Sequence, residues 1–78
     1  MDEITYKGFI VYPTPVQLEG GEWSTDIWIR INRYKDTATR KLNSRDTFPT
    51  REEAVTHCLQ FGKDIIDDKI EGLTVEDL

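Results

Sequence analysis

One amphipathic helix near the end of the chain limits the fold more than any other feature of the sequence. Thr50 is followed three residues later by Glu53, the pattern of a capping box, and Pro49 discourages helical backbone just before it. Two mostly apolar rows then repeat with the helical period: Ala54, Cys58, Phe61 and Ile65, beside Val55, Leu59, Gly62 and Ile66. Together these rows cover an arc of roughly 160° of the helix circumference, which is wide enough to pack on a sheet.

The end of this helix and its closest approach to the sheet can also be predicted. Lys69 would fall near the middle of the apolar arc, so we expect the buried part of the helix to end at about Asp67 or Asp68. Gly62 lies in the middle of the arc, where the absence of a side chain weakens the helix but allows the sheet to come close.

The residues before the helix carry strand patterns. The run from Ile4 to Tyr12 is rich in β-branched and aromatic residues and stops at Pro13. Residues 23–32 alternate with period two, so Trp23, Ile27, Ile29 and Ile31 point one way and Ser24, Asp26, Trp28, Arg30 and Asn32 the other. A polar third strand is expected over residues 39–47. The sequence therefore predicts an α+β fold, a three-stranded antiparallel sheet packed on one face by a C-terminal α-helix (β-β-β-α).

A chain of 78 residues is one domain, whose ordered core we expect at about residues 4–69. The acidic tail, residues 71–78, either makes a short extra helical turn or stays flexible. A domain of this size has little room for an enclosed substrate pocket. The acidic N-terminus and the short apolar runs are unlike a signal peptide or a membrane span, so a cytoplasmic protein is expected.

The residues available for chemistry are few. Cys58 and His57 are the single cysteine and histidine, which excludes an internal disulfide and a zinc-type cluster; they also point about 100° apart on the helix, so they cannot form a dyad. Four acidic residues share one helical face and are interpreted as solvated surface rather than a cation site: Asp64, Asp67, Asp68 and Glu71. We expect no catalytic residues, no metal and no cofactor.

Charge is distributed unevenly along the chain. The net charge is −5, yet residues 30–45 contain six basic residues and one acidic residue, a local charge of +5. Basic side chains on a hairpin and an edge strand discourage unwanted pairing with other sheets. A charged partner is the other interpretation.

The sheet face away from the helix is the best candidate for function. If the isoleucines of residues 23–32 pack under the helix, Trp28 points outward, and we expect Phe9, Val11 and Arg30 to complete an interface there. The favoured hypothesis is a protein-interaction module that binds a second copy of itself, or an unidentified protein, through this face. Residues 13–18 or the tail could instead cover the patch.

The alternative hypothesis is weak binding of single-stranded nucleic acid or RNA. Aromatic rings of Trp28 and Phe9 would stack on bases, and four basic residues would contact phosphates: Lys7, Arg30, Lys41 and Arg45. The acidity of the whole chain disfavours it, since such domains usually have a pI above about 9.

Several segments resemble a family of very small, stand-alone bacterial proteins of uncharacterised function. The resemblance covers most of residues 6–67 and rests on Tyr6-Lys7-Gly8-Phe9-Ile10, Trp23, Phe48-Pro49-Thr50-Arg51-Glu52-Glu53-Ala54 and Phe61-Gly62-Lys63-Asp64-Ile65-Ile66-Asp67. It implies a β-β-β-α arrangement grouped with double-stranded-RNA-binding-like folds, and no activity. The leading helix of a true RNA-binding domain has no counterpart, and Arg51-Glu52-Glu53 replaces its lysine cluster, so the resemblance does not predict RNA binding.

Overall fold

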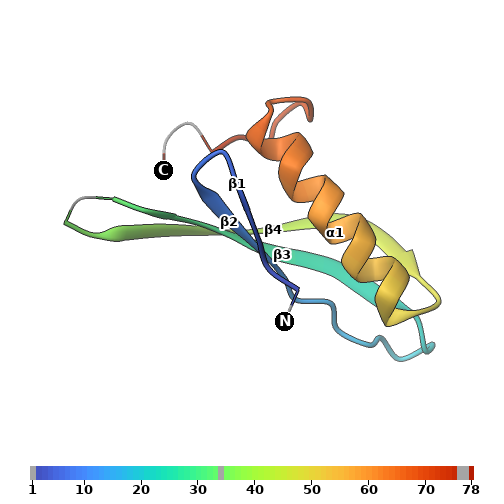
Figure 1. Ribbon diagram of the computed structural model, residues 1–78. Coiled ribbons are helices and arrows are strands. Elements are labelled where there is room, and N and C mark those ends of the chain that lie inside the picture. Colours follow the sequence, from blue (N-terminus) through green and yellow to red (C-terminus); the bar gives the residue numbers. More distant parts are fainter. Residues whose placement is uncertain (1, 34, 76–77) are drawn as a thin grey trace.

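The computed structural model describes residues 2–33, 35–75 and 78. Its elements are β1 (Ile4–Tyr6), β2 (Phe9–Pro13), β3 (Trp23–Asn32), β4 (Thr37–Phe48) and α1 (Arg51–Ile66). The strands form one antiparallel sheet in the order β1-β2-β3-β4, with α1 lying across one face and the β3–β4 hairpin projecting beyond it (Figure 1). The α+β fold with a C-terminal helix is confirmed. The described sheet has four strands, not the three predicted.

The additional strand arises because the run from Ile4 to Tyr12 folds back on itself. Lys7 and Gly8 form a two-residue turn with φ values of 51° and 87°, and Tyr6 pairs with Phe9 across it. Two central residues with positive φ define the hairpin turn whose twist suits antiparallel strands. The prediction of one continuous strand was wrong because Lys-Gly is a weaker turn signal than Asn-Gly or Asp-Gly.

Strand β4 contains a β-bulge opposite the buried polar residue Thr25 of β3. Between the pairs Ser24–Thr47 and Asp26–Asn43, β4 has three residues and β3 has one, Thr25. This bulge is possible because one of its residues, Arg45, takes φ of 67°. The fully buried Thr25 hydroxyl donates to the carbonyl of Asp46 at 2.8 Å, which satisfies its donor away from water.

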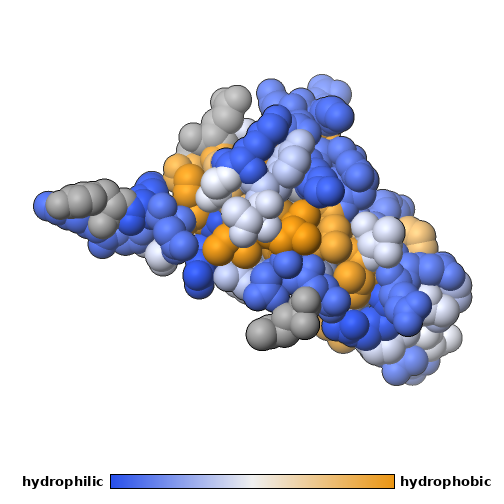
Figure 2. Space-filling model, viewed as in Figure 1, coloured by the Kyte–Doolittle hydropathy of each residue, from blue (hydrophilic) through white to orange (hydrophobic). Residues whose placement is uncertain are grey.

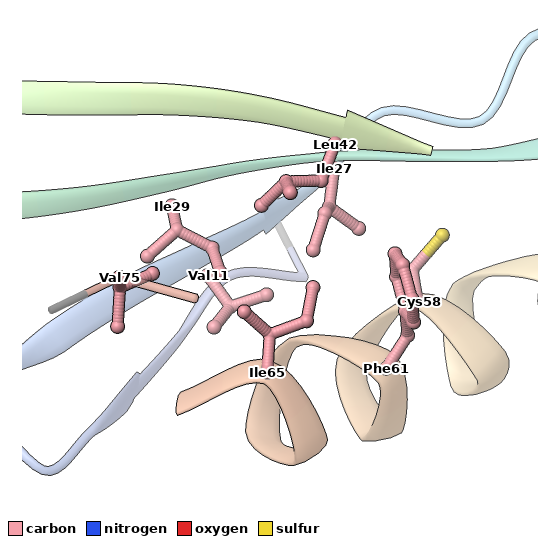
Figure 3. Close-up of a cluster of buried hydrophobic side chains, with 8 residues drawn as sticks. All are labelled: Val11, Ile27, Ile29, Leu42, Cys58, Phe61, Ile65 and Val75. Atoms are coloured by element: carbon pink, nitrogen blue, oxygen red, sulfur yellow. The ribbon is translucent and has the colours of Figure 1, made fainter. Parts of the chain in front are cut away.

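The helix begins where the sequence predicts. The Thr50 hydroxyl accepts a hydrogen bond from the Glu53 backbone N–H at 3.2 Å, and Asp67 caps the other end. Side chains from both layers converge between sheet and helix (Figure 3): Val11, Ile27, Ile29, Leu42, Cys58, Phe61, Ile65 and Val75. The predicted helix face is therefore confirmed.

The tail continues the core instead of forming another helix. Ile70, Leu73 and Leu78 pack against the core, Val75 is only 4% exposed, and the Arg40 guanidinium donates to the Thr74 carbonyl at 2.8 Å. The described part of residues 71–78 makes turns and no helical turn, while residues 76–77 lie outside the described residues. The packed core thus extends beyond residue 69.

Hydrophobic residues gather in the seam between α1 and the sheet, whereas the projecting hairpin and the exposed side of the helix are hydrophilic (Figure 2). Among the described residues, no helix is long and apolar enough to cross a membrane.

Candidate functional site

The strand register decides which side chains occupy the outer sheet face, the face opposite α1. Val11 pairs with Ile29, and both are fully buried under the helix. Because successive side chains alternate between faces, the next pair along, Tyr12 and Trp28, points outward. Lys41 pairs with Trp28 from the other side, so these three residues form one row across the sheet.

A second outward row lies beside the first. Ile10 pairs with Arg30, whose guanidinium carbon is 5.6 Å from the centre of the Tyr12 ring. The Lys41 Nζ atom is 5.9 Å from the centre of the Trp28 ring. These separations allow cation–π attraction, so the two basic side chains lie over the aromatic rings. We call Ile10, Tyr12, Trp28, Arg30 and Lys41 the outer patch.

Of the four residues predicted for the interface, the structure places two on the outer sheet face. Trp28 is 39% exposed and points outward as expected, together with Arg30. Val11 is 0% exposed and Phe9 packs against the core, so their assignment to this face was wrong. The signal missed in the sequence was the Tyr12 hydroxyl, which makes full burial costly and favours placing Tyr12, with Ile10, on the open face.

The segment after β2 does not cover Trp28. The Thr14 N–H donates to the Asp26 carbonyl at 2.8 Å, and the Ser24 N–H donates to the Val16 carbonyl at 2.9 Å, so the segment runs along the edge of β3. It buries Ser24 but leaves Trp28 exposed. Since the described tail packs on the helix side, neither segment that the sequence offered as a cover lies over the outer patch.

The four basic residues proposed for nucleic-acid binding do not form one group. Arg30 and Lys41 share the outer patch. Lys7 lies in the β1–β2 turn, where its ammonium group pairs with the Asp67 carboxylate, and Arg45 lies in the bulge of β4. Alternation along β4 also places Arg40 on the helix side. The basic stretch is therefore divided between faces.

Asp67 joins the end of the helix to the first hairpin. Its carboxylate accepts hydrogen bonds from the ammonium group of Lys7 and, at 2.7 Å, from the hydroxyl of Tyr6. The Lys7 hydrogen bond, followed by that of Tyr6, lowers the pKa of Asp67 below its ordinary value. The same carboxylate raises the pKa of both partners, since it favours their protonated forms.

We predict that Asp67→Asn destabilises the fold near neutral pH but has little effect in acid. A lowered folded-state pKa means that the carboxylate stabilises the native chain above its unfolded pKa of about 3.9, and that this contribution disappears as pH falls through the lower, folded value. Urea midpoints from neutral pH to strong acid measure this. The parent and variant curves should converge in acid, whereas Glu71→Gln, an exposed change of equal charge, should follow the parent. A constant gap at every pH would contradict the prediction.

The residues that the sequence analysis considered for catalysis or metal binding are buried or form contacts within the fold. Burial raises the pKa of the Cys58 thiol to about 11, and its Sγ lies 3.5 Å from the Asp26 carbonyl. Asp64 accepts from Gln60 at 2.9 Å, and Asp67 forms the link described above. Among residues 2–33, 35–75 and 78, no three His, Cys, Asp or Glu side chains come together in a group that could hold a metal ion.

Fold and surface together define a small α+β domain whose sheet has one face covered by a helix and one open face with an aromatic centre. Comparison of the chain with family models, with curated proteins and with solved structures finds no match.

Proposed function

We propose that this domain is a cytoplasmic protein-interaction module that forms a homodimer through the outer patch. The observation that carries the proposal is Trp28, a large aromatic side chain 39% exposed in the middle of an open sheet face and flanked by the half-buried Ile10 and Tyr12. Tryptophan, tyrosine and arginine are the residues that most often anchor protein interfaces.

Charges on the outer face favour a second copy as the occupant. Asp26 and Arg30 lie on this face of β3, two residues to either side of Trp28. Consider two copies face to face, related by a two-fold axis that crosses the strands at Trp28. The axis reverses the strand direction, so each Arg30 lies opposite the Asp26 of the other copy, and the Trp28 rings meet at the centre. A second copy is thus complementary in charge at Arg30 and Asp26, while Lys41, in the same row as Trp28, lies opposite the Lys41 of the other copy.

Sedimentation velocity tests the dimer. The parent chain should show a two-chain species at micromolar to millimolar concentration, and Trp28→Asp should be a folded monomer, with dimer affinity reduced at least about 30-fold, the effect of losing an interface anchor. Leu18→Asp is the matched control, because Leu18 is similarly exposed at 41% but lies in the β2–β3 connection. A parent that stays monomeric at millimolar concentration would overturn the proposal, as would equal effects of both variants.

Nucleic-acid binding remains the second candidate because Arg30 and Lys41 lie beside the rings of Tyr12 and Trp28. Two phosphate contacts to a single strand would give a slope of about −1.4 in log affinity against log salt, and Trp28→Ala would cost about 1 to 3 kcal/mol in lost stacking. Amide chemical shifts measured at low salt, with a short mixed-sequence single strand and with duplex RNA, distinguish the two functions. The homodimer proposal expects no shift in the outer patch at millimolar ligand.

A further inference from the structure

A second surface, on the helix side of the molecule, carries features that the dimer does not use. It is an open groove of about 640 Å³ between the N-terminal half of α1 and the end of β4, lined by Phe48, Glu52, Glu53, Thr56, His57 and Gln60. We call it the α1–β4 groove. Four of its lining residues are exposed polar side chains of two successive helix turns, and two are rings, so it has both an apolar and a polar side.

The apolar side of the groove is the pair of aromatic rings of Phe48 and His57, which the buried ring of Phe61 supports. The Phe48 and His57 rings have centroids 5.0 Å apart, and His57 in turn stacks on the buried Phe61 ring at 6.2 Å. The His57 Nε2 atom is buried and makes no hydrogen bond of good geometry, but it lies 3.2 Å from a carboxylate oxygen of Asp46. The two rings, tilted by 43° to each other, therefore form an aromatic wall of the groove.

The electrostatic character of the groove is acidic. Glu52 and Glu53 line it, and Asp46 lies next to His57. No lysine or arginine is among its lining residues, and Arg51, the nearest basic residue along the helix, pairs with Asp2 at 3.3 Å. A cation that entered the groove would therefore meet carboxylates without competition from a lining basic side chain.

We propose that the α1–β4 groove binds an arginine side chain carried by an extended segment of another protein. A guanidinium group is planar, stacks on aromatic rings and binds carboxylates through paired N–H donors, which matches the Phe48 and His57 rings beside Glu52 and Glu53. An ammonium group can bind the carboxylates and be attracted to a ring, but it lacks the flat face that stacks on a ring and the paired N–H donors that bind a carboxylate.

The length of the groove indicates a peptide rather than a free cation. From Glu52 to Gln60 the helix rises about 12 Å, the length of three to four residues of extended chain. Thr56 and Gln60 line the far part of this path and can hydrogen-bond to the backbone of the segment. Because the groove uses α1 and the end of β4 rather than the outer patch, this inference does not depend on the dimer.

NMR titration of the full-length chain tests the inference with the tripeptide acetyl-Gly-Arg-Gly-amide. Amide and ring signals of Phe48, His57 and Thr56 should shift with half-saturation in the low-millimolar range, about what one anchored side chain supplies. The same tripeptide with citrulline, a neutral planar analogue of arginine, should bind at least about fivefold more weakly, because the carboxylates then face no charge. Trp28→Asp should leave this titration unchanged.

A charge-matched pair of variants separates the groove from general acidity. Glu52→Gln with Glu53→Gln should weaken arginine peptide binding at least about fivefold, while Asp68→Asn with Glu71→Gln removes the same charge at exposed positions outside the groove and should leave binding within twofold. Thermal unfolding of both variants verifies that each is folded. The inference is wrong if groove signals do not shift at about 20 mM peptide, if citrulline binds as well as arginine, or if the two double variants lose affinity equally.

Discussion

Phe61→Ala should leave most of the chain unfolded at room temperature. The ring is 6% exposed and lies in the core between α1 and the sheet (Figure 3), and it stacks on His57. Removing a buried phenyl ring costs about 3 to 5 kcal/mol, because apolar contacts are lost and the cavity collapses only in part. A single core in a chain below about 80 residues rarely supplies more than about 3 to 5 kcal/mol in total.

Circular dichroism on heating measures this outcome. The variant should show a reduced helical signal at low temperature and no cooperative transition, whereas Gln60→Ala, an exposed change one position earlier in the helix, should melt within a few degrees of the parent. A cooperative transition of Phe61→Ala close to that of the parent would mean that the core tolerates the loss, and that the energetic centre of the fold lies elsewhere.

Elements with strong local signals could be predicted from the sequence. Strand β3 has the predicted bounds, because its alternation of isoleucine with polar residues admits one register. Helix α1 begins at the predicted cap, because the Thr50 hydroxyl satisfies the Glu53 backbone N–H within a single turn. Both predictions needed only residues a few positions apart.

Features that depend on distant pairing could not be predicted. The face on which Phe9 and Val11 lie is set by the pairing of β2 with β3, and both faces of β2 are apolar, so its own pattern leaves two registers open. The packing of Val75 depends on where the chain turns after α1. The location of Trp28 was predictable, and the Tyr12 hydroxyl was the sequence signal for the outward face of Ile10 and Tyr12, which the pairing of β2 with β3 then fixes.

The first hairpin and the end of the helix, residues 6–10 and 61–67, meet in the folded chain. Tyr6 and Lys7 of the first segment bind Asp67 of the last, and Gly62 of the last lies against Val11, two residues beyond the Tyr6–Phe9 turn segment. Each of these residues has a packing or hydrogen-bonding role. These contacts dock the first hairpin on the end of the helix.

Gly62→Ala is the second substitution that we expect to change stability strongly, because Gly62 lies against Val11. A methyl group placed on Gly62 would lie 2.5 Å from Cγ1 and 2.8 Å from Cγ2 of Val11, closer than van der Waals contact permits. Val11 is β-branched and fully buried, so it has few other rotamers in which to relieve the overlap. Gly62→Ala gains about 1 kcal/mol in helix propensity and loses about 1 to 3 kcal/mol by overpacking. We therefore expect a net loss of up to about 2 kcal/mol, although the same change at an exposed helical site would stabilise the chain.

A double-mutant cycle with Val11→Ala isolates this contact. Val11→Ala alone leaves a cavity and destabilises the fold, and the added methyl group of Gly62→Ala should occupy part of that cavity. The double variant should thus lose less free energy of unfolding than the two single losses added together. We expect a coupling energy of about 1 to 3 kcal/mol from urea unfolding at neutral pH. Ile29→Val with Gly62→Ala is the control cycle, because Ile29 is buried in the same core but is not among the atoms nearest to the added methyl group. Additive effects in the Val11 cycle would show that the helix and the sheet do not approach each other at Gly62.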